Sequence, residues 1–289
     1  MLVRFTDSDT DISKKEAEEL GYRLISMPYA IDGKEILPYV DFDEFDYKSF
    51  YDTLRTGVLP TTSALSVDNY KDYFEPVFAA GDDILYVHFS RAMTATFDSM
   101  DKAVADLKEK YPERKFYEID TKMITVGSYV IVREIGRMAL AGASAEELVE
   151  WAKTEVDRFA VYFFADDLTF FRHSGRVSGI AGIMGTLLGV RPIIHIGEDG
   201  KMVSIGKEKG RARALERLVD VVSELGDNVL DHEFVVAHTD AEDLANELRE
   251  MLKERLGAEK LPDIVVTNPT AGSHCGPNSV GVAFHAKHR

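Results

Sequence analysis

Short apolar runs alternate with amphipathic stretches along almost the whole chain, and this alternation constrains the fold more than any single motif. The runs 83–89 and 115–120 are rich in β-branched and aromatic residues, as buried strands are. The stretch 94–111 between them has the apolar spacing of a helix that rests on a sheet. Regular alternation of this kind predicts an α/β fold, with a largely parallel sheet and helices on both faces.

The length of 289 residues predicts two domains of ordinary size. Ser144 followed by Glu147 has the spacing of a capping box, and the helix that it opens leads into the second unit. We expect an N-terminal α/β domain over residues 1–157 and a smaller C-terminal α/β domain over residues 158–289.

Local signals predict several boundaries within these units. Asp11 is expected to cap a helix that Gly21 closes, and Asp32-Gly33 is typical of a hairpin turn. In the second unit we expect a hairpin over 191–206, after two helices at 168–176 and 179–189. The glycines of the second helix are expected to serve packing and turns, because their spacing fits no phosphate-binding fingerprint.

The charge balance excludes one broad class of partner. The 34 basic and 50 acidic side chains give a net charge of −16, and a field of that sign repels nucleic-acid backbones. No run is long and apolar enough to predict stable membrane insertion. The first eleven residues become acidic before any apolar signal region forms, so we expect a cytoplasmic protein.

Metal binding is not predicted. One cysteine forms no internal disulfide and no cysteine-rich zinc site, and the eight histidines are scattered. The segment 7–11 (DSDTD) resembles the start of a calcium loop, but the glycine and glutamate of such a loop do not follow at the required spacing. We interpret it as a strand end that leads into a helix cap.

A glycine-rich segment, 268–284 (NPTAGSHCGPNSVGVAF), places the only cysteine beside a histidine. We expect this segment to be a loop. Its glycines lack the spacing and the Lys-Ser/Thr ending of a nucleotide-binding P-loop. A hydrolase or transferase with Cys275 as nucleophile stays open as an alternative, but adjacent residues of an extended segment point apart, so His274 is not its expected base.

Two hydroxyl-rich segments, 60–66 and 88–97, adjoin predicted regular elements. In a parallel sheet such loops gather at the carboxyl edge of the strands, where ligands bind. Thr94 would lie near the start of a helix, where unpaired N–H groups favour an anion. Turn and capping roles explain the same residues equally well.

Taken together, these motifs resemble the DegV family of fatty-acid-binding proteins, and they occur in the family's order over nearly the whole chain. The departures are Leu65 for a proline, Thr94 for a serine, Ala95 and Asn278 for glycines, and Arg91 for a small residue. Thr94 keeps the hydroxyl group, and Asn tolerates positive φ. The matching segments are Asp7-Ser8, TSALS (62–66), SRAMTATF (90–97), Asp120-Thr121, SGRVS (174–178), RPI (191–193) and GSHCGPN (272–278).

The resemblance implies a ligand site between two α/β domains and no cofactor. A long-chain fatty acid such as palmitate, stearate or oleate would be held at its carboxylate by the hydroxyl loops and the last histidine. On this sequence these residues are Thr62, Ser63, Thr94 and His274, with Arg176 close to the head group. The acyl chain would enter an apolar tunnel with Phe170, Phe171, Ile180, Ile183, Met184 and Leu187 as candidate lining.

The resemblance also implies that the protein is a carrier and not a catalyst. It would present the fatty acid to a separate dihydroxyacetone-kinase-like fatty acid kinase, which forms an acyl phosphate for phospholipid synthesis. The basic segment 206–217 corresponds to a region that would face this kinase, with Arg211 and Arg213 as docking residues. A regulatory module that senses a small anion is the remaining alternative.

Overall fold

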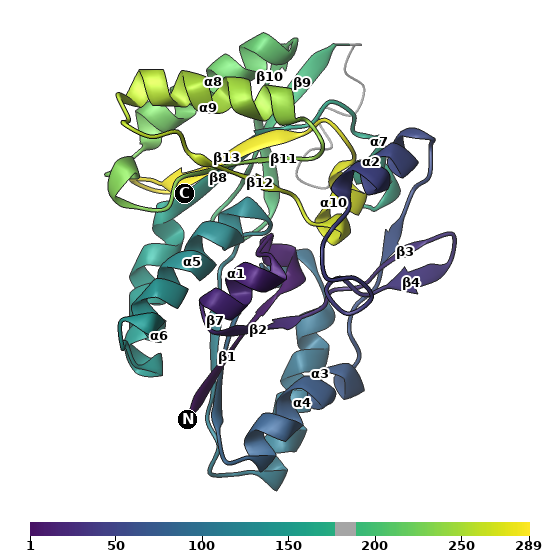
Figure 1. Ribbon diagram of the computed structural model, residues 1–289, viewed down its shortest axis with the longest axis vertical. Helices are drawn as coiled ribbons and strands as arrows, with labels where there is room; N and C mark the ends of the chain where they lie inside the picture. The colour runs from purple at the N-terminus through teal and green to yellow at the C-terminus, as the bar shows by residue number, and fades with distance from the viewer. Residues whose placement is uncertain (177–188) are drawn as a thin grey trace.

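The computed structural model describes residues 1–176 and 189–289, and it contains two main sheets (Figure 1). The first is parallel throughout and has the strand order β2-β1-β6-β7. Its strands are β1 (Leu2–Asp7), β2 (Tyr22–Ile25), β6 (Asp83–His88) and β7 (Phe116–Asp120). The expectation of a parallel N-terminal sheet is confirmed.

Helices cover both faces of the parallel sheet because alternate residues of β6 point to opposite sides. Ile84 and Tyr86 pack against α3 and α4, whereas Leu85 and Val87 face α1 and α5. The helices of this half are α1 (Lys14–Glu19), α2 (Tyr47–Arg55), α3 (Val67–Ala79), α4 (Thr96–Lys110), α5 (Val126–Leu140) and α6 (Ala145–Glu155).

The second sheet is mixed and has the order β10-β9-β8-β13-β11-β12, in which only β11 and β12 pair in parallel. Its strands are β8 (Phe159–Phe164), β9 (Val190–Ile196), β10 (Met202–Lys209), β11 (Val235–His238), β12 (Asp263–Val266) and β13 (Val280–His285). The expected hairpin is β9–β10. The α-helices in the described part of this half are α7 (Thr169–His173), α8 (Arg211–Leu225), α9 (Glu242–Leu256) and α10 (Pro269–Cys275).

The two faces of the mixed sheet have different neighbours (Figure 1). Tyr162 and Phe164 of β8 pack under α8 and α9, whereas Val161 between them packs in the core cluster that includes α5. Helix α5 therefore lies between the two sheets and contributes to the packing of both. We propose the domain boundary at residues 157/158, just before β8.

A small third sheet connects the two halves. β3 (Tyr29–Ile31) pairs with β4 (Lys34–Ile36) through the predicted Asp32-Gly33 turn, in which both residues have positive φ. β3 also pairs with β5 (Thr61–Thr62), a two-residue strand in a segment that we expected to be only loop. This pairing fixes Thr62 opposite Tyr29.

Two other local predictions are wrong. Helix α1 begins after Ser13, whose side chain forms a capping box with Glu16, so Asp11 is not its cap. The segment expected to be a loop at 268–284 contains helix α10, which Asn268 caps. The predicted helix at 179–189 lies almost entirely outside the described residues.

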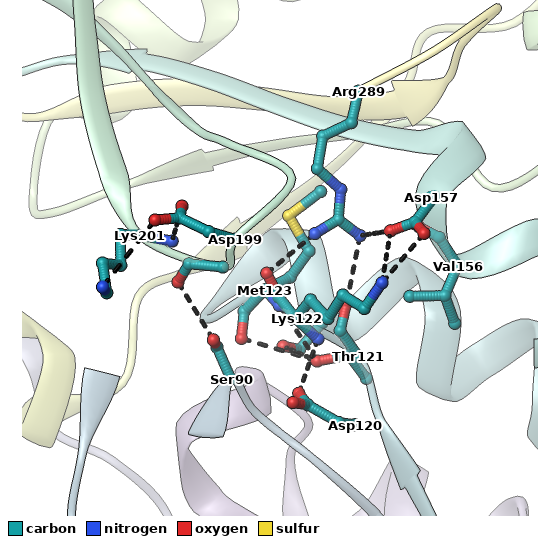
Figure 2. A network of polar contacts seen from close by, with 12 residues as sticks. Ser90, Asp120, Thr121, Lys122, Met123, Val156, Asp157, Asp199, Lys201 and Arg289 are labelled. Carbon is teal, nitrogen blue, oxygen red and sulfur yellow. Dashed lines mark hydrogen bonds and ion pairs between the residues drawn. The ribbon is translucent and has the colours of Figure 1, made fainter. Parts of the chain in front are cut away.

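Polar contacts also tie the two sheets together (Figure 2). The Arg289 guanidinium donates to the backbone oxygens of Lys122 (3.0 Å), Thr121 (3.3 Å) and Val156 (2.7 Å). Nearby, the Ser90 hydroxyl donates to the Gly200 oxygen (3.0 Å) at the tip of the β9–β10 hairpin. A Cβ at Gly200 would lie 2.3 Å from Ser90 Oγ, so a glycine is required for this contact.

Candidate functional site

A cavity of about 280 Å³ lies between the parallel sheet and the mixed sheet. On one side it meets loops at the carboxyl ends of the parallel strands, including Phe89 after β6 and Ile124 after β7. On the other side it meets the face of the mixed sheet that α8 and α9 do not cover. The site therefore lies where the topology of a parallel sheet predicts a ligand.

Most of the cavity wall is apolar. Val161 and Phe163 reach it from one face of β8, and Ala237 reaches it from β11. Of the predicted tunnel residues, Phe171 lines this cavity, whereas Phe170 packs against Gly276 and in the cluster around Tyr29. Ile180, Ile183, Met184 and Leu187 lie outside the described residues.

All five residues predicted to contact the head group line this same cavity, although they come from segments far apart in the sequence. Their elements are β5, the start of α4, the segment after α7, and α10. The structure therefore brings together the residues that the sequence singled out. Their roles toward a ligand stay a prediction. The five are Thr62, Ser63, Thr94, Arg176 and His274.

Helix α10 positions His274. The backbone N–H and the side-chain amide of Asn268 both donate to Asp11 Oδ1, at 2.8 Å and 2.7 Å, and Asn268 in turn caps the helix. The Thr270 hydroxyl donates to the Met27 oxygen (2.8 Å). These contacts fix the helix to the parallel-sheet half, so Asp11 supports the site through Asn268 instead of capping α1.

His274 is an uncharged hydrogen-bonding group. Burial lowers its pKa to about 3, and the charges of Arg176 and His173 act in the same direction. Its Nε2 lies 3.1 Å from the Thr62 hydroxyl oxygen, and its buried Nδ1 contacts no polar group among the described residues. A neutral imidazole donates one hydrogen bond and accepts another, and the tautomer decides which atom does which.

Thr94 precedes the N-terminus of the 15-residue helix α4. Its hydroxyl oxygen accepts the N–H of Thr96 (3.1 Å), which leaves the Thr94 O–H for donation. The positive end of the helix dipole points toward this position and favours an anion. Arg91 stands where the DegV pattern has a small residue. Its guanidinium forms ion pairs with Asp101 (2.7 Å) and Glu118 (2.5 Å).

Ser63 and Arg176 lie at the edge of this group. The exposed Ser63 donates its hydroxyl to Glu35 (3.0 Å), so its proton is already engaged. The half-buried Arg176 donates to the Ser174 backbone oxygen (2.7 Å). Arg176 lies near enough to His274 to lower the pKa of that imidazole, and it is the cationic side chain on the described cavity wall.

Cys275 is poorly suited to nucleophilic chemistry. Burial raises the pKa of its thiol to about 12, and the charge of Asp11 adds to the shift. The thiolate is the reactive form, and it is scarce at neutral pH in such surroundings. His274, the adjacent residue on α10, bonds to Thr62 instead. Cys275 therefore contributes a small side chain to the cavity wall.

Asp9 is a cavity residue that the sequence analysis did not single out. It lies in the 3₁₀ helix η1 (Ser8–Thr10) directly after β1, and it is 4% exposed. Its carboxyl atom Oδ1 is buried without a polar partner among the described residues. The available signal was a run of three alternate aspartates at the end of a predicted strand, which we interpreted as a strand end that leads into a helix cap.

Asn278 lies between α10 and Ser279, which lines the cavity. Asn278 has φ of 66°, in the left-handed region where Asn replaces Gly at modest cost. Its backbone N–H donates to the Thr239 oxygen (2.7 Å), and the Ser279 N–H donates to the Thr239 hydroxyl (2.7 Å). This departure from the DegV pattern is therefore compatible with the local backbone.

Within residues 1–176 and 189–289, no group of three histidine, cysteine or acidic side chains has the arrangement of a metal site. In the same residues no helix combines the length and the hydropathy needed to cross a membrane.

Known proteins resemble this chain along its whole length. A family model described as "Uncharacterised protein, DegV family" matches residues 4–287. A DegV domain-containing protein of Clostridium perfringens is 30% identical over 284 residues, which cover 98% of this chain and 96% of the relative. These matches agree with the motif order found in the sequence.

Solved structures share the fold. A DegV family protein from Ruminococcus gnavus, described with vaccenic acid, has a TM-score of 0.85 at 21% identity and covers 98% of this chain and 99% of its own. A stearic acid-binding protein from Eubacterium ventriosum has a TM-score of 0.85 at 22% identity and covers 99% of both chains. From the family match, the relative and the shared fold, we conclude that this chain belongs to the DegV family.

Proposed function

We propose that this protein binds one long-chain fatty acid in the cavity between its two sheets. The observation that carries the proposal is the cavity's composition: an apolar wall from both sheets that also carries hydroxyl groups and a neutral histidine, of which Thr62 and His274 contact each other. Membership of the DegV family supports it, as do the neighbours described with vaccenic acid and as stearic acid-binding.

The energetics favour an amphiphile with a long tail. About fifteen buried methylenes contribute a gross term of about 12 kcal/mol at about 0.8 kcal/mol each. A hydrogen bond to a charged group adds about 1.5–3 kcal/mol. The tail therefore supplies most of the affinity, and the polar groups fix the orientation and prevent an unpaired buried carboxylate.

The head group would bind through a short relay. With its proton on Nε2, His274 donates to the Thr62 oxygen, so the Thr62 O–H is left to donate to the carboxylate. Thr94 supplies a second O–H at the N-terminus of α4. Arg176 adds positive charge at the edge of the site, and Ser63 would contribute only after releasing Glu35.

Mass spectrometry of the bound lipid tests the binding proposal. Protein purified from a bacterial host is denatured and extracted, and we expect about one fatty acid per chain. In titrations with palmitate, Thr94→Val should lose about tenfold in affinity, whereas Thr94→Ser, which keeps the hydroxyl, should match the unmodified protein. Absence of both extracted lipid and palmitate uptake would contradict the proposal.

We further propose that the protein is a cytoplasmic carrier that presents the fatty acid to a dihydroxyacetone-kinase-like fatty acid kinase, for phospholipid synthesis. This step rests on the DegV resemblance and on the exposed basic start of α8. Arg211 is paired with Asp166, whereas Arg213 is exposed. Arg213→Glu should therefore slow ATP-dependent formation of acyl phosphate by the kinase without changing palmitate affinity. An unchanged rate would remove Arg213 from the docking surface.

A further inference from the structure

The segment 7–11 holds three buried aspartates in different situations. Asp7 accepts the Tyr86 hydroxyl (3.1 Å) and the Phe89 N–H (3.2 Å), and Asp11 accepts two N–H groups of Asn268. None of these donors forms a hydrogen bond to the Asp9 side chain, and Asp9 lines the cavity. Within the described residues, Asp9 alone of the three both lines the cavity and has a buried carboxyl oxygen, Oδ1, without a polar partner.

Asp9 lies at the same part of the cavity as the proposed head-group site. Thr270, which contacts the Asp9 carboxyl, is one helical turn from His274, so both lie on one face of α10. The Arg176 guanidinium is close enough to influence the charge of both Asp9 and His274. A carboxylate bound by Thr62 and His274 would therefore meet Asp9.

The charges around Asp9 disfavour its ionised form. Its pKa is raised well above the usual 3.8, first by burial and then by Asp7 and Asp11, whereas the cation of Arg176 acts in the opposite direction. His274 on α10 is neutral, and the start of α5 presents the uncharged Thr125 and Val126. The sequence of residues 177–188, next to Arg176, contains no ionisable side chain.

The Thr270 hydroxyl gives its single proton to the Met27 oxygen, so it is at most an acceptor toward Asp9. The Thr270 oxygen can accept the O–H of a protonated Asp9, whereas it offers no donor to an ionised Asp9. A second carboxylate brought into the cavity would repel an ionised Asp9, and two adjacent carboxyl groups resolve this conflict by holding one proton between them.

We propose that Asp9 is a specificity-determining residue of this site: it stays protonated and donates its proton in a hydrogen bond to the carboxylate of the bound fatty acid. This inference rests on the proposed function. The occupied site then holds one proton shared by two carboxyl groups. Arg176 balances the single negative charge that remains.

The proton balance makes binding depend on pH in one direction. Below the pKa of Asp9 in the ligand-free protein, the proton is already present, and the fatty acid anion binds without proton exchange. Above that pKa a proton must be taken up from solvent, so affinity falls about tenfold per pH unit. Asp9→Asn carries an N–H donor at every pH, so its affinity loses this dependence.

The experiment measures palmitate affinity for the full chain from pH 6 to pH 10, with wild type and Asp9→Asn side by side. Because palmitate's own aggregation is common to both, the ratio of the two affinities isolates Asp9. We expect a ratio near one at low pH and tenfold tighter binding by Asp9→Asn for each pH unit above the transition. Calorimetry at a pH above the transition, in two buffers of different protonation enthalpy, should show proton uptake by wild type alone.

Two further variants keep the test decisive. Asp9→Ser also removes the carboxyl, so it should lose the same pH dependence if Asp9→Asn folds poorly. Asp243→Asn is the matched control: it makes the same change at an exposed carboxyl on α9 that does not line the cavity, so the wild-type pH profile should persist. A ratio that stays constant with pH overturns the role of Asp9 and leaves fatty acid binding intact. No palmitate binding by any variant overturns the proposed function and this inference with it.

Discussion

His274 combines a strongly lowered pKa with a position on the cavity wall, and the pKa makes a prediction about stability. A histidine whose pKa falls from 6.5 to about 3 on folding is neutral in the folded state and protonated more readily in the unfolded state. Its contribution to the free energy of unfolding is complete above pH 6.5 and is lost as pH falls toward 3. In urea titrations, the free energy of unfolding of His274→Asn should therefore decrease less than that of wild type as pH falls through this interval. Parallel pH curves would contradict a buried neutral His274.

Asp11 makes the opposite prediction. Burial raises its pKa from 3.8 to about 7, so the folded state binds more protons than the unfolded state between these values. The free energy of unfolding then falls as pH rises from about 4 to about 7, by up to about 1.4 kcal/mol per pH unit from this group. The free energy of unfolding of Asp11→Asn should rise relative to that of wild type through that interval, and the difference should stay constant at higher pH. Chemical denaturation at five pH values checks this.

At the scale of elements, α10 connects the mixed sheet to the parallel-sheet half through close packing at a glycine. A Cβ at Gly272 would lie 2.5 Å from the Tyr51 hydroxyl oxygen, and Tyr51 is fully buried and donates to the Thr267 oxygen (3.1 Å). Tyr51 therefore has little freedom to move away.

We expect Gly272→Ala to destabilise the protein by about 1–3 kcal/mol through overpacking, despite the better helix propensity of alanine. It should also weaken palmitate binding, because the helix carries His274. Gly206→Ala is the matched control, since a Cβ there meets no atom within 4 Å. Thermal unfolding of both variants tests this destabilisation, and equal melting temperatures would show that α10 tolerates displacement.

The sequence predicted the elements whose signals are local. The apolar run 83–89 identified β6, and Asp32-Gly33 identified the β3–β4 turn. Helix α10 was missed because its seven residues include a glycine, and its stability depends on the Asn268–Asp11 contact between residues 257 positions apart. Strand β5 is two residues long and forms only because Thr62 meets Tyr29.

The site was predictable to the extent that its residues belong to recognisable motifs. Four of the predicted residues belong to such motifs, and all four line one cavity: Thr62, Thr94, Arg176 and His274. Asp9 was missed because an aspartate after a strand is typical of a turn, and its burial depends on α10 and α5 packing over η1. Sequence alone also gave no indication that Ser63 bonds to Glu35.

At the scale of the whole molecule, the cavity is an unfilled part of the packing between two sheets. Phe89 and Ile124 approach it from the parallel half, and Val161 and Ala237 approach it from the mixed sheet. An acyl chain in this position would add apolar contacts to both halves at once. Ligand binding should therefore stabilise the molecule as a unit and not one sheet alone.

This linkage gives the last prediction. A ligand that binds only the folded state adds RT ln(1 + [L]/Kd), about 2.7 kcal/mol at a hundredfold excess over Kd, which corresponds to a rise of several degrees in melting temperature. We expect delipidated protein to show this rise with palmitate, with intrinsic tyrosine fluorescence and circular dichroism reporting one shared transition. Butanoate offers the same carboxylate with almost no tail, so it should leave the melting temperature unchanged at equal concentration. An equal shift with both acids would mean that the head group, and not the apolar cavity, dominates binding.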